Sequence, residues 1–236
     1  MRGPVPARIV DLSHPLREGV QVYPGDPVLS LSPAATLDRD GFNVLNVVMG
    51  SQTGTHIDAP YHFFADGARV DELDLALFIG PAVLADVRGK PPRGRITWED
   101  LTPYADQLAP GCILVLHTGW SAHFGTRMYF EHPWLDPEAA ERILDAGVRT
   151  IALDSLNPDE TRLDGGAPKR FPVHLLVLGA GGVIAENLTN IAAVDFANPV
   201  LSLFPLSLAA ADGAPVRAVA MEYRHQLTPL PAGVIV

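Results

Sequence analysis

The sequence predicts one mixed α/β domain with more strand than helix. First, the chain has 236 residues, of which 47% are hydrophobic and 19% charged, which suits one sizeable core and argues against disorder. Second, short strand-like runs alternate with tight turns, in a chain with 22 prolines and 21 glycines. Third, a well-capped helix leads into another strand. Because no linker divides the chain, we expect a single domain over residues 1–236.

The first half of the chain reads as strands joined by turns. ARIVDLSHPL (7–16) predicts a strand that runs into a turn, and QVYPGDPVLSLSP (21–33) is rich in turn residues such as Pro24-Gly25. A strand over Asn43–Met49 leads through Gly50 into a polar motif. Two further strands are predicted in GPAVLADVRG (80–89) and CILVLHTGW (112–120).

The second half contains the clearest helix, Pro137 to Ala146. Asp136 is a good N-cap, Pro137 suits the first helical position, and Gly147 is placed for a C-cap. Three predictions follow it along the chain: a strand in RTIALDS (149–155); a short helix, glycine turn and strand in FPVHLLVLGAGGVIAENL (171–188); and two strands around Asp212-Gly213 in residues 199–224. These local signals do not fix the order of strands in the sheet.

Composition excludes several classes of protein. The formal net charge of −10, with scattered Lys and Arg, argues against binding to nucleic acid or to an anionic membrane. The longest apolar runs, such as residues 174–185, are too short and too interrupted by glycine to span a bilayer. The N-terminal residues lack the apolar segment of a secretory signal. The single Cys112 excludes an internal disulfide, so we expect a cytoplasmic protein.

The stretch SQTGTHIDAPYHFF (51–64) carries the first chemical signal. Imidazole and carboxylate are the usual ligands of zinc and manganese, and on an extended segment His56 and Asp58 point the same way. Pro60 stiffens the exit from this segment, and His62 beyond it could act as a general acid or base near neutral pH. The alternative reading is a polar loop whose side chains satisfy one another by hydrogen bonds.

A second candidate cluster lies late in the chain. His174 stands in an apolar context, PVHLLVL (172–178), and Glu186 follows in VIAENL (183–188). A charged Glu in such a context is costly to bury unless it is paired or binds a metal. The alternatives are a solvent-facing Glu at a strand end and a core histidine satisfied by hydrogen bonds.

TGTHIDAPYHF (53–63) resembles the H-x-G-T-H-x-D-x-P-x-H signature of the cyclase family of metal-dependent hydrolases. That family includes bacterial kynurenine formamidases, isatin hydrolases and some dienelactone hydrolases. The resemblance covers nearly the whole chain, through the segments 11–27, 117–120, 172–188 and 205–219. It implies the family's α/β fold, which is a single domain with a barrel-like mixed β-sheet core flanked by helices. It also implies a homo-oligomer, either a dimer or a tetramer.

Carried over by position, the resemblance implies a metal site and its proton carrier. It makes His56, Asp58, His174 and Glu186 ligands of Zn²⁺ or Mn²⁺, with one or two ions per subunit, and His62 the catalytic acid/base. Gln52 stands where the signature has its first histidine. An amide oxygen is a weaker and harder ligand than imidazole, so one of two metal positions is weakened, empty, or better suited to Mn²⁺.

Further residues are candidates for supporting roles. In LDSLNPDE (153–160), Asp154 and Asp159 look equivalent to acidic positions of the family and could support the ligands from behind, or could instead cap turns. Aromatic side chains are candidate walls of a substrate pocket, with plain core packing as the alternative: Tyr23, Phe63, Phe64 and Trp120. Residues 127–137 are either a flap over the site or the loop that leads into the predicted helix.

Two other enzyme classes are excluded by their missing motifs. LGAGGVIAE (178–186) lacks the third glycine of a dinucleotide-binding turn, because Ile184 stands at its position. Ser51 and Ser121 have no G-x-S-x-G elbow around them, which argues against a serine hydrolase.

The resemblance also predicts a reaction on a small-molecule substrate. A bound metal lowers the pKa of a water and polarises a carbonyl, and His62 would pass the proton to the leaving atom. We favour hydrolysis of an amide or lactam C–N bond in a small, aromatic or cyclic substrate, such as an N-formyl aryl amine or an isatin-like lactam. Two alternatives remain open. One is a lactone or ester hydrolase or a ring-closing cyclase; the other is a non-catalytic metal- or ligand-binding protein.

Overall fold

The computed structural model describes residues 5–163 and 171–223 and is built around one nine-stranded mixed sheet. The strand order is β1-β13-β11-β5-β7-β9-β10-β4-β12. The strands are β1 (Pro6–Asp11), β4 (His56–Asp58), β5 (Ile79–Asp86), β7 (Ile113–His117), β9 (Thr150–Leu153), β10 (Val183–Glu186), β11 (Val200–Ser202), β12 (Gly213–Pro215) and β13 (Val219–Tyr223). The mixed α/β fold expected from the sequence is confirmed, and the structure supplies the strand order that local signals left open.

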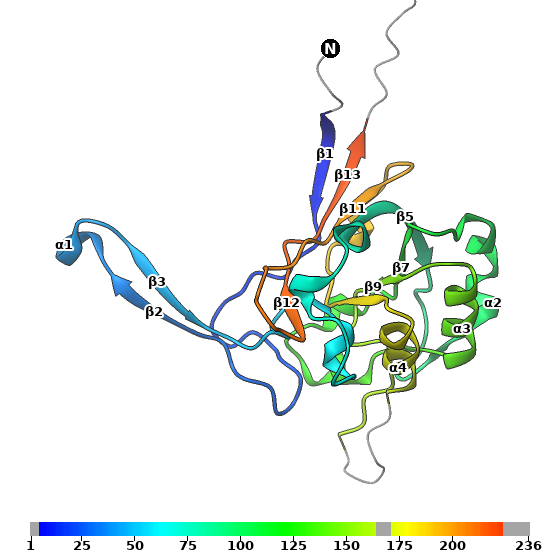
Figure 1. The fold of residues 1–236 in the computed structure, drawn as a ribbon, viewed down its shortest axis with the longest axis horizontal. Helices are drawn as coiled ribbons and strands as arrows, with labels where there is room; N and C mark the ends of the chain where they lie inside the picture. The colour runs from blue at the N-terminus through cyan, green and yellow to red at the C-terminus, as the bar shows by residue number, and fades with distance from the viewer. Residues whose placement is uncertain (1–4, 164–170, 224–236) are drawn as a thin grey trace, which may run out of the picture.

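The centre of the sheet is parallel and buried on both faces. β5, β7, β9 and β10 pair in parallel. β7, β9 and β10 are almost entirely buried apolar runs, as expected for strands covered on both sides, whereas β5 is partly exposed. Helices α3 (Pro137–Asp145) and α4 (Pro172–Gly179) cover one face, where Ile143 and Val177 pack against Leu114 and Leu116 (Figure 1). The opposite face encloses a second core that includes Ile57 and Val115.

The sheet curls until its two ends approach each other. β12 is the last strand in the order and β13 the second, yet only residues 216–218 separate them along the chain. Backbone hydrogen bonds join this short link to both ends, from Leu12 N to the Ala218 oxygen and from Val216 N to the Thr55 oxygen. The expected barrel-like core is therefore a curled sheet with few helices on its outside.

The predicted helix at residues 137–146 is confirmed with its caps. α3 spans Pro137–Asp145, the Asp136 carboxylate accepts a hydrogen bond from Glu138 N at 3.1 Å, and Gly147 has a φ of 88°. The expected helix, turn and strand over 171–188 appear as α4 and β10. The remaining helices are short: α1 (Leu37–Asp40) and α2 (Trp98–Leu101), with 3₁₀ turns η1 (Pro60–His62), η2 (Val70–Glu72), η3 (Leu75–Phe78), η4 (Thr102–Gln107), η5 (Trp120–His123), η6 (Arg127–Glu131) and η7 (Ile191–Ala193).

The strand predicted over Asn43–Met49 forms, but outside the main sheet. It is β3 (Val44–Val48), and it pairs antiparallel with β2 (Ser30–Ala35), a strand inside the segment that the sequence predicts as turn-rich. Together they make a two-stranded sheet that extends from the body as a long arm (Figure 1). A second small sheet joins β6 (Arg95–Ile96) to β8 (Trp134–Leu135).

Two segments differ from their simplest sequence reading. The last third holds three short strands rather than two, and the Asp212-Gly213 turn leads directly into β12. There, a Cβ on Gly213 would lie 2.3 Å from the Ile57 oxygen, so glycine allows the close approach to β4. Residues 127–137 are a packed connection to α3 and not an exposed flap, because Tyr129 and His132 are fully buried. Among the described residues, no helix is long and apolar enough to cross a membrane.

Candidate active site

One pocket of about 270 Å³ gathers most of the sequence-predicted site residues. Its walls come from five parts of the chain: residues 21–26, residues 52–63, the loop after β9 at 156–157, the start of α4 at 171–174, and the end of β10 at 186–187. Segments that are far apart in the sequence therefore meet at one opening. A cavity of this size accommodates a small organic molecule and little more.

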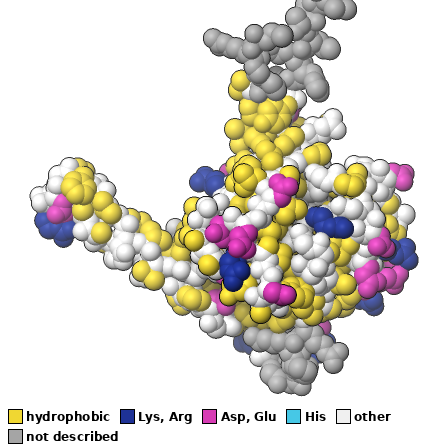
Figure 2. All heavy atoms as spheres, in the orientation of Figure 1, with side chains coloured by type: hydrophobic (Ala, Val, Ile, Leu, Met, Phe, Trp, Pro, Cys, Tyr) yellow, Lys and Arg dark blue, Asp and Glu magenta, His cyan; other side chains and the backbone are white. Residues whose placement is uncertain are grey.

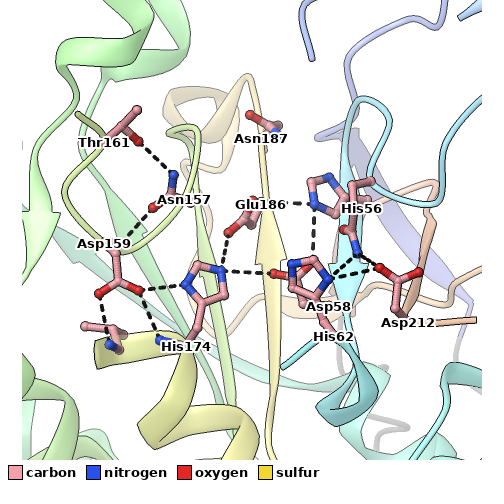
Figure 3. A network of polar contacts seen from close by, with 12 residues as sticks. His56, Asp58, His62, Asn157, Asp159, Thr161, His174, Glu186, Asn187 and Asp212 are labelled. Atoms are coloured by element: carbon pink, nitrogen blue, oxygen red, sulfur yellow. Dashed lines mark hydrogen bonds and ion pairs between the residues drawn. The ribbon is translucent and has the colours of Figure 1, made fainter. Parts of the chain in front are cut away.

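Four ligand-type side chains converge at the floor of this pocket (Figure 3). His56 and Asp58 lie on β4, and the alternation of the strand places both on the pocket side while Ile57 faces the core. Glu186 lies directly opposite His56 on the antiparallel neighbour β10. His174 reaches the same point from α4. All four side chains are almost completely buried.

Within this cluster, each carboxylate offers one oxygen to each histidine. His56 Nε2 lies 3.4 Å from Asp58 Oδ1 and 3.4 Å from Glu186 Oε2. His174 Nε2 lies 3.4 Å from Asp58 Oδ2 and 3.2 Å from Glu186 Oε1. The two histidines thus flank a pair of carboxylates on opposite sides, an arrangement in which Asp58 can bridge two ions.

Unsatisfied oxygen atoms indicate that the cluster is suited to a cation. Asp58 Oδ1 and Oδ2 and Glu186 Oε1 are buried and accept no hydrogen bond from the described residues. Leaving such atoms without a partner is costly, and a metal ion would satisfy them. His56, Asp58 and Glu186 offer ligand atoms that all lie within 4.8 Å of one another. The nitrogen and carboxylate donors are of the kind that zinc and manganese bind.

The pKa shifts of the two histidines also indicate that the cluster is suited to a cation. Burial opposes protonation of His56, but the adjacent carboxylates of Asp58 and Glu186 outweigh it and raise the pKa of His56 to about 10. Against the same opposing burial, Asp159, Asp58 and Glu186 raise the pKa of His174 well above its usual value. Without a metal, the buried carboxylates therefore draw protons onto the histidines. A divalent cation supplies the same compensating charge and releases those protons.

Both histidines are held from behind so that Nε2 faces the cluster. His56 Nδ1 donates to the Gly54 oxygen at 2.9 Å, and His174 Nδ1 donates to Asp159 Oδ2 at 2.6 Å. Asp159 also accepts from the backbone N–H groups of Val173 and His174, at 2.9 and 3.1 Å, at the start of α4. Such carboxylate–histidine pairs fix the tautomer and the ring orientation of metal-binding histidines.

Asp154 caps a turn, which is one of the two roles that the sequence suggested for Asp154 and Asp159. Its carboxylate accepts hydrogen bonds from Thr118 N at 2.7 Å, Thr118 Oγ1 at 2.6 Å and Gly119 N at 2.9 Å. These contacts tie the loop after β7 to the end of β9. Asp154 therefore shapes the loop beside the site, whereas Asp159 touches a cluster histidine.

Sequence reasoning missed Asp212, which holds the candidate proton carrier. His62 Nδ1 lies 2.9 Å from Asp212 Oδ2, and the same carboxylate accepts from Gln52 Nε2 at 2.8 Å and Ser51 Oγ at 2.7 Å. Because the carboxylate accepts, the proton sits on Nδ1 and leaves Nε2 for proton exchange. Burial opposes the shift, but Asp212 raises the pKa of His62 above its usual value. The only sequence signal is an Asp-Gly turn, which many loops share.

Gln52 lines the pocket and is part of this hydrogen-bond group. Its amide nitrogen is committed to Asp212, and it also lies 3.3 Å from His62 Nδ1. Its oxygen Oε1 is buried with no hydrogen-bond partner in the described part of the chain. That Gln52 is a metal ligand stays a prediction.

Asn187 is a second residue that the sequence did not single out. Its side chain accepts a hydrogen bond from Tyr129 Oη at 2.8 Å and donates to the Gly54 oxygen at 3.0 Å, the same oxygen that orients His56. Its φ of 56° is a left-handed value that asparagine tolerates well. Asn187 therefore fastens the end of β10 to the loop that carries His56.

The structure separates the four candidate aromatic residues into two pairs. Tyr23 and Phe63 line the pocket, and Phe63 packs 4.8 Å from the His174 ring and 5.3 Å from the ring of Phe171, an aromatic wall that the sequence did not indicate. Phe64 instead packs on the core, and Trp120 is buried beside Tyr129. Both lie outside the pocket lining, and Phe64 does so although it directly follows Phe63 in the sequence.

Comparisons with known proteins agree with this geometry. The Cyclase family model matches residues 10–160. The kynurenine formamidase of Bacillus cytotoxicus is 34% identical over 212 residues, covering 89% of this chain and 95% of that protein. That of Delftia acidovorans is 31% identical over 215 residues, covering 90% and 96%. Among solved structures, isatin hydrolase A from Labrenzia aggregata bound to benzyl benzoate superposes with a TM-score of 0.82 at 25% identity, covering 92% of this chain and 94% of that one.

The fold and the site together define a hydrolase with a buried cluster able to bind a metal ion. The family model covers more than half of the chain, and the formamidases exceed 30% identity over most of its length. The chain belongs to the Cyclase family.

Proposed function

We propose that this protein hydrolyses an amide or lactam C–N bond of a small, aromatic or cyclic substrate, as an arylformamidase or isatin hydrolase does. The observation that carries the proposal is the buried cluster of two carboxylates and two histidines at the floor of a pocket with an acid/base histidine beside it. The kynurenine formamidases and isatin hydrolase A support the bond type and the aromatic substrate.

The cluster is proposed to hold Zn²⁺ or Mn²⁺ through His56, Asp58, His174 and Glu186. When bound, such an ion lowers the pKa of a water and polarises a carbonyl. Asp159 and the Gly54 carbonyl keep both imidazoles turned toward the ion through their Nδ1 protons. Whether the cluster takes one or two ions depends on Gln52, which would have to supply the ligand that a histidine supplies in the family signature.

His62 is proposed to move the proton during the reaction. Its Nδ1–H donates to Asp212, so Nε2 can accept a proton and later deliver it to the leaving nitrogen. The rings of Phe63 and Phe171, together with Tyr23, would hold a flat substrate over the cluster. The 270 Å³ of the pocket limits the substrate to a small molecule.

A second candidate reaction is supported by one of the similar structures. A potential metal-dependent hydrolase with cyclase activity superposes with a TM-score of 0.71 at 26% identity, covering 92% of this chain and 98% of that one. Opening a lactone or ester, or the reverse ring closure, needs the same water activation and the same proton carrier. His62 could deliver a proton to a leaving nitrogen or to a leaving oxygen, so the site fits both reactions. The two candidates differ only in the leaving atom of the substrate.

The test is a hydrolysis screen of the protein loaded with Zn²⁺ or with Mn²⁺. N-formyl anilides and isatins represent the C–N candidates, and lactones represent the C–O candidate. We expect the highest kcat/KM with an aromatic formamide or lactam. Higher kcat/KM with lactones would favour the second reaction. No turnover of any substrate by metal-loaded protein would contradict both.

The protein is further proposed to be a cytoplasmic homo-oligomer, a dimer or a tetramer. The single Cys112, which is buried and unpaired, is consistent with a reducing compartment. The proposal of an oligomer comes from the family resemblance, and its measure is the molecular mass in solution.

A further inference from the structure

Four amide side chains line the pocket, and Gln52 differs from the other three in what it holds. The other three fasten parts of the wall by bonding to backbone groups or to hydroxyl groups: Gln21, Asn157 and Asn187. The amide of Gln52 instead donates to a carboxylate oxygen, Asp212 Oδ2, at 2.8 Å. That carboxylate is the partner of the proposed proton carrier His62.

The carboxylate determines which branch of the Gln52 amide is the nitrogen. A carboxylate oxygen only accepts hydrogen bonds, so the atom 2.8 Å from Asp212 Oδ2 has to be the donor Nε2. The other branch, Oε1, has no hydrogen-bond partner in the described part of the chain. A Cβ on Gly213 would lie 2.8 Å from Gln52 Nε2, so the glycine that follows Asp212 leaves room for the amide.

Asp212 is held at both of its carboxylate oxygens and at its backbone. Ser51 Oγ donates to Oδ1 at 2.7 Å, while Gln52 Nε2 and His62 Nδ1 both donate to Oδ2. The backbone oxygen of Asp212 accepts from Ala59 N at 2.9 Å, directly after β4. Because its backbone and Oδ1 are fixed, the carboxylate keeps Oδ2 on the side of His62.

The pair formed by His62 and Asp212 needs this support because water reaches it. The side chains of His62 and Asp212 are 30% and 32% exposed. A partly exposed ion pair contributes little by itself, since water competes for both partners. Among the described residues no lysine or arginine pairs with Asp212, and Figure 2 shows such side chains on the outer surface and at the tip of the arm. The neutral donors of Ser51 and Gln52 therefore hold the carboxylate in place.

We propose that Gln52 is a positioning residue for proton transfer. Its amide keeps Asp212 Oδ2 turned toward His62 Nδ1, so that the imidazole carries its proton on Nδ1 and presents Nε2 to the reacting groups. The role uses only Nε2 of Gln52 and stands whether or not Oε1 binds a metal ion. It rests on the hydrolysis proposed above, and it gives a function to the residue that replaces the first histidine of the family signature.

The first test is the dependence of kcat on the leaving group. The substrates are formanilides with a nitro group, a hydrogen or a methoxy group in the para position, and the protein is saturated with Zn²⁺. Gln52→Met nearly keeps the length of the side chain but donates no hydrogen bond. We expect kcat to fall about 10-fold for the methoxy compound, whose poor leaving group needs the proton, and less than about 2-fold for the nitro compound. KM should change little.

Two further variants separate positioning from general damage to the pocket. Gln21→Met is the matched control, because Gln21 also lines the pocket but bonds to the backbone of residues 125–126 instead of to Asp212. It should leave the dependence on the leaving group as in the wild type. In an Asp212→Asn background, Gln52→Met should lower kcat by less than about 2-fold more, because residues that act through one another are not additive.

Nitrogen NMR of the His62 ring tests the same role without turnover. The ring signals are identified by their loss in His62→Ala and are recorded at a pH where the ring is neutral. In the wild type and in Gln21→Met the proton should reside on Nδ1, whereas in Gln52→Met the tautomer with the proton on Nε2 should appear.

Either measurement can overturn the positioning role. It is wrong if Gln52→Met leaves the dependence on the leaving group or the tautomer unchanged, or if Gln21→Met alters them equally. Protein that hydrolyses none of the formanilides would contradict the proposed arylformamidase reaction, and the tautomer would then decide by itself whether Gln52 holds the His62–Asp212 pair.

Discussion

At the scale of single residues, the site divides into groups that bind charge and groups that orient them. Asp58 and Glu186 carry the buried negative charge, His56 and His174 face it with Nε2, and Asp159 holds one of those rings from behind. His62 belongs to a separate group with Asp212. Because the two groups share no hydrogen bond, substitutions in one should leave the function of the other measurable.

His62→Ala should remove the proton carrier without removing the metal. We expect kcat to fall about 10²–10⁴-fold, the range that general acid–base catalysis contributes, while the metal content stays unchanged. Asp212→Asn should give a smaller loss and move the acidic limb of the pH–rate profile to lower pH, because the carboxylate that raises the pKa of His62 is gone. The measurements are kcat across pH and metal analysis of each variant. A His62→Ala protein with undiminished turnover would remove His62 from the mechanism.

Asp159→Asn should weaken metal binding, because it removes the carboxylate that orients His174. The expected loss of affinity is about 10–100-fold, measured by competition with a chelator. Asp154→Asn is its matched control. Asp154 is as deeply buried and lies in the same loop region, but it contacts Thr118 and Gly119 instead of a cluster histidine. Equal losses of affinity in both variants would indicate a general disturbance of the loop.

Gln52→His restores the residue type of the family signature. If Gln52 lies at a metal position, the variant should bind a metal ion there more tightly, since imidazole is the better ligand for zinc. Titration calorimetry with Zn²⁺ gives the number of ions and their affinity. An unchanged number and affinity would place Gln52 outside the coordination sphere and limit its role to the hydrogen bond with Asp212.

At the scale of elements, the sequence predicts the helices and strands whose formation depends on residues adjacent in the chain. The helix α3 follows from Asp136, Pro137 and Gly147, which act on adjacent backbone groups. The strand β3 is predicted to within a residue at each end, but its partner is not, because pairing depends on residues outside the strand. For the same reason Phe63 and Phe64 cannot be told apart before the structure shows which way each one points.

The connection that leads into α3 contains a pH-sensitive histidine. Burial lowers the pKa of His132 to about 4, from a usual 6.5. Its Nδ1 donates to the Pro133 oxygen, and its Nε2 accepts from Thr161 Oγ1 at 2.8 Å, a role that only the neutral ring can fill. The unfolded chain binds a proton below pH 6.5 and the folded one only below about 4. Stability is therefore complete above pH 6.5 and is lost as the pH falls toward 4.

The size of this loss is about 3 kcal/mol, at roughly 1.4 kcal/mol for each unit of difference in pKa. Urea unfolding of chelator-treated protein between pH 4 and 8 should show this loss in the free energy of unfolding. In His132→Gln, the free energy of unfolding should depend less steeply on pH. His14, whose pKa burial also lowers to about 4, remains in the variant and keeps its own contribution. If the free energy of unfolding varied with pH in the same way for the wild type and His132→Gln, protonation of His132 would not destabilise the fold.

At the scale of the whole molecule, the site exists because the curled sheet brings distant segments together. The motif around His56 and Asp58 can be found from the sequence, since its residues are neighbours. That Glu186 lies opposite His56, and that His174 completes the group, depends on the antiparallel register of β4 and β10 and on the packing of α4. Asp212 enters from the turn just before β12, the strand that follows β4 in the sheet order. Local signals do not encode these contacts.

Since the cluster joins β4, β10 and α4, a bound cation should stabilise the entire fold. At a free metal concentration about 100 times the dissociation constant, linkage adds about 2.7 kcal/mol. For a chain of this length that corresponds to a rise in melting temperature of roughly 5–10 °C. Differential scanning calorimetry of chelated protein, with and without Zn²⁺ or Mn²⁺, measures the shift. Glu186→Gln should abolish it, whereas Glu131→Gln, a half-buried change that removes an ion pair with Arg93 away from the pocket, should retain it. A wild-type protein whose melting temperature neither ion raises does not hold a metal at this cluster, and the proposed hydrolysis would then lack its means of activating water.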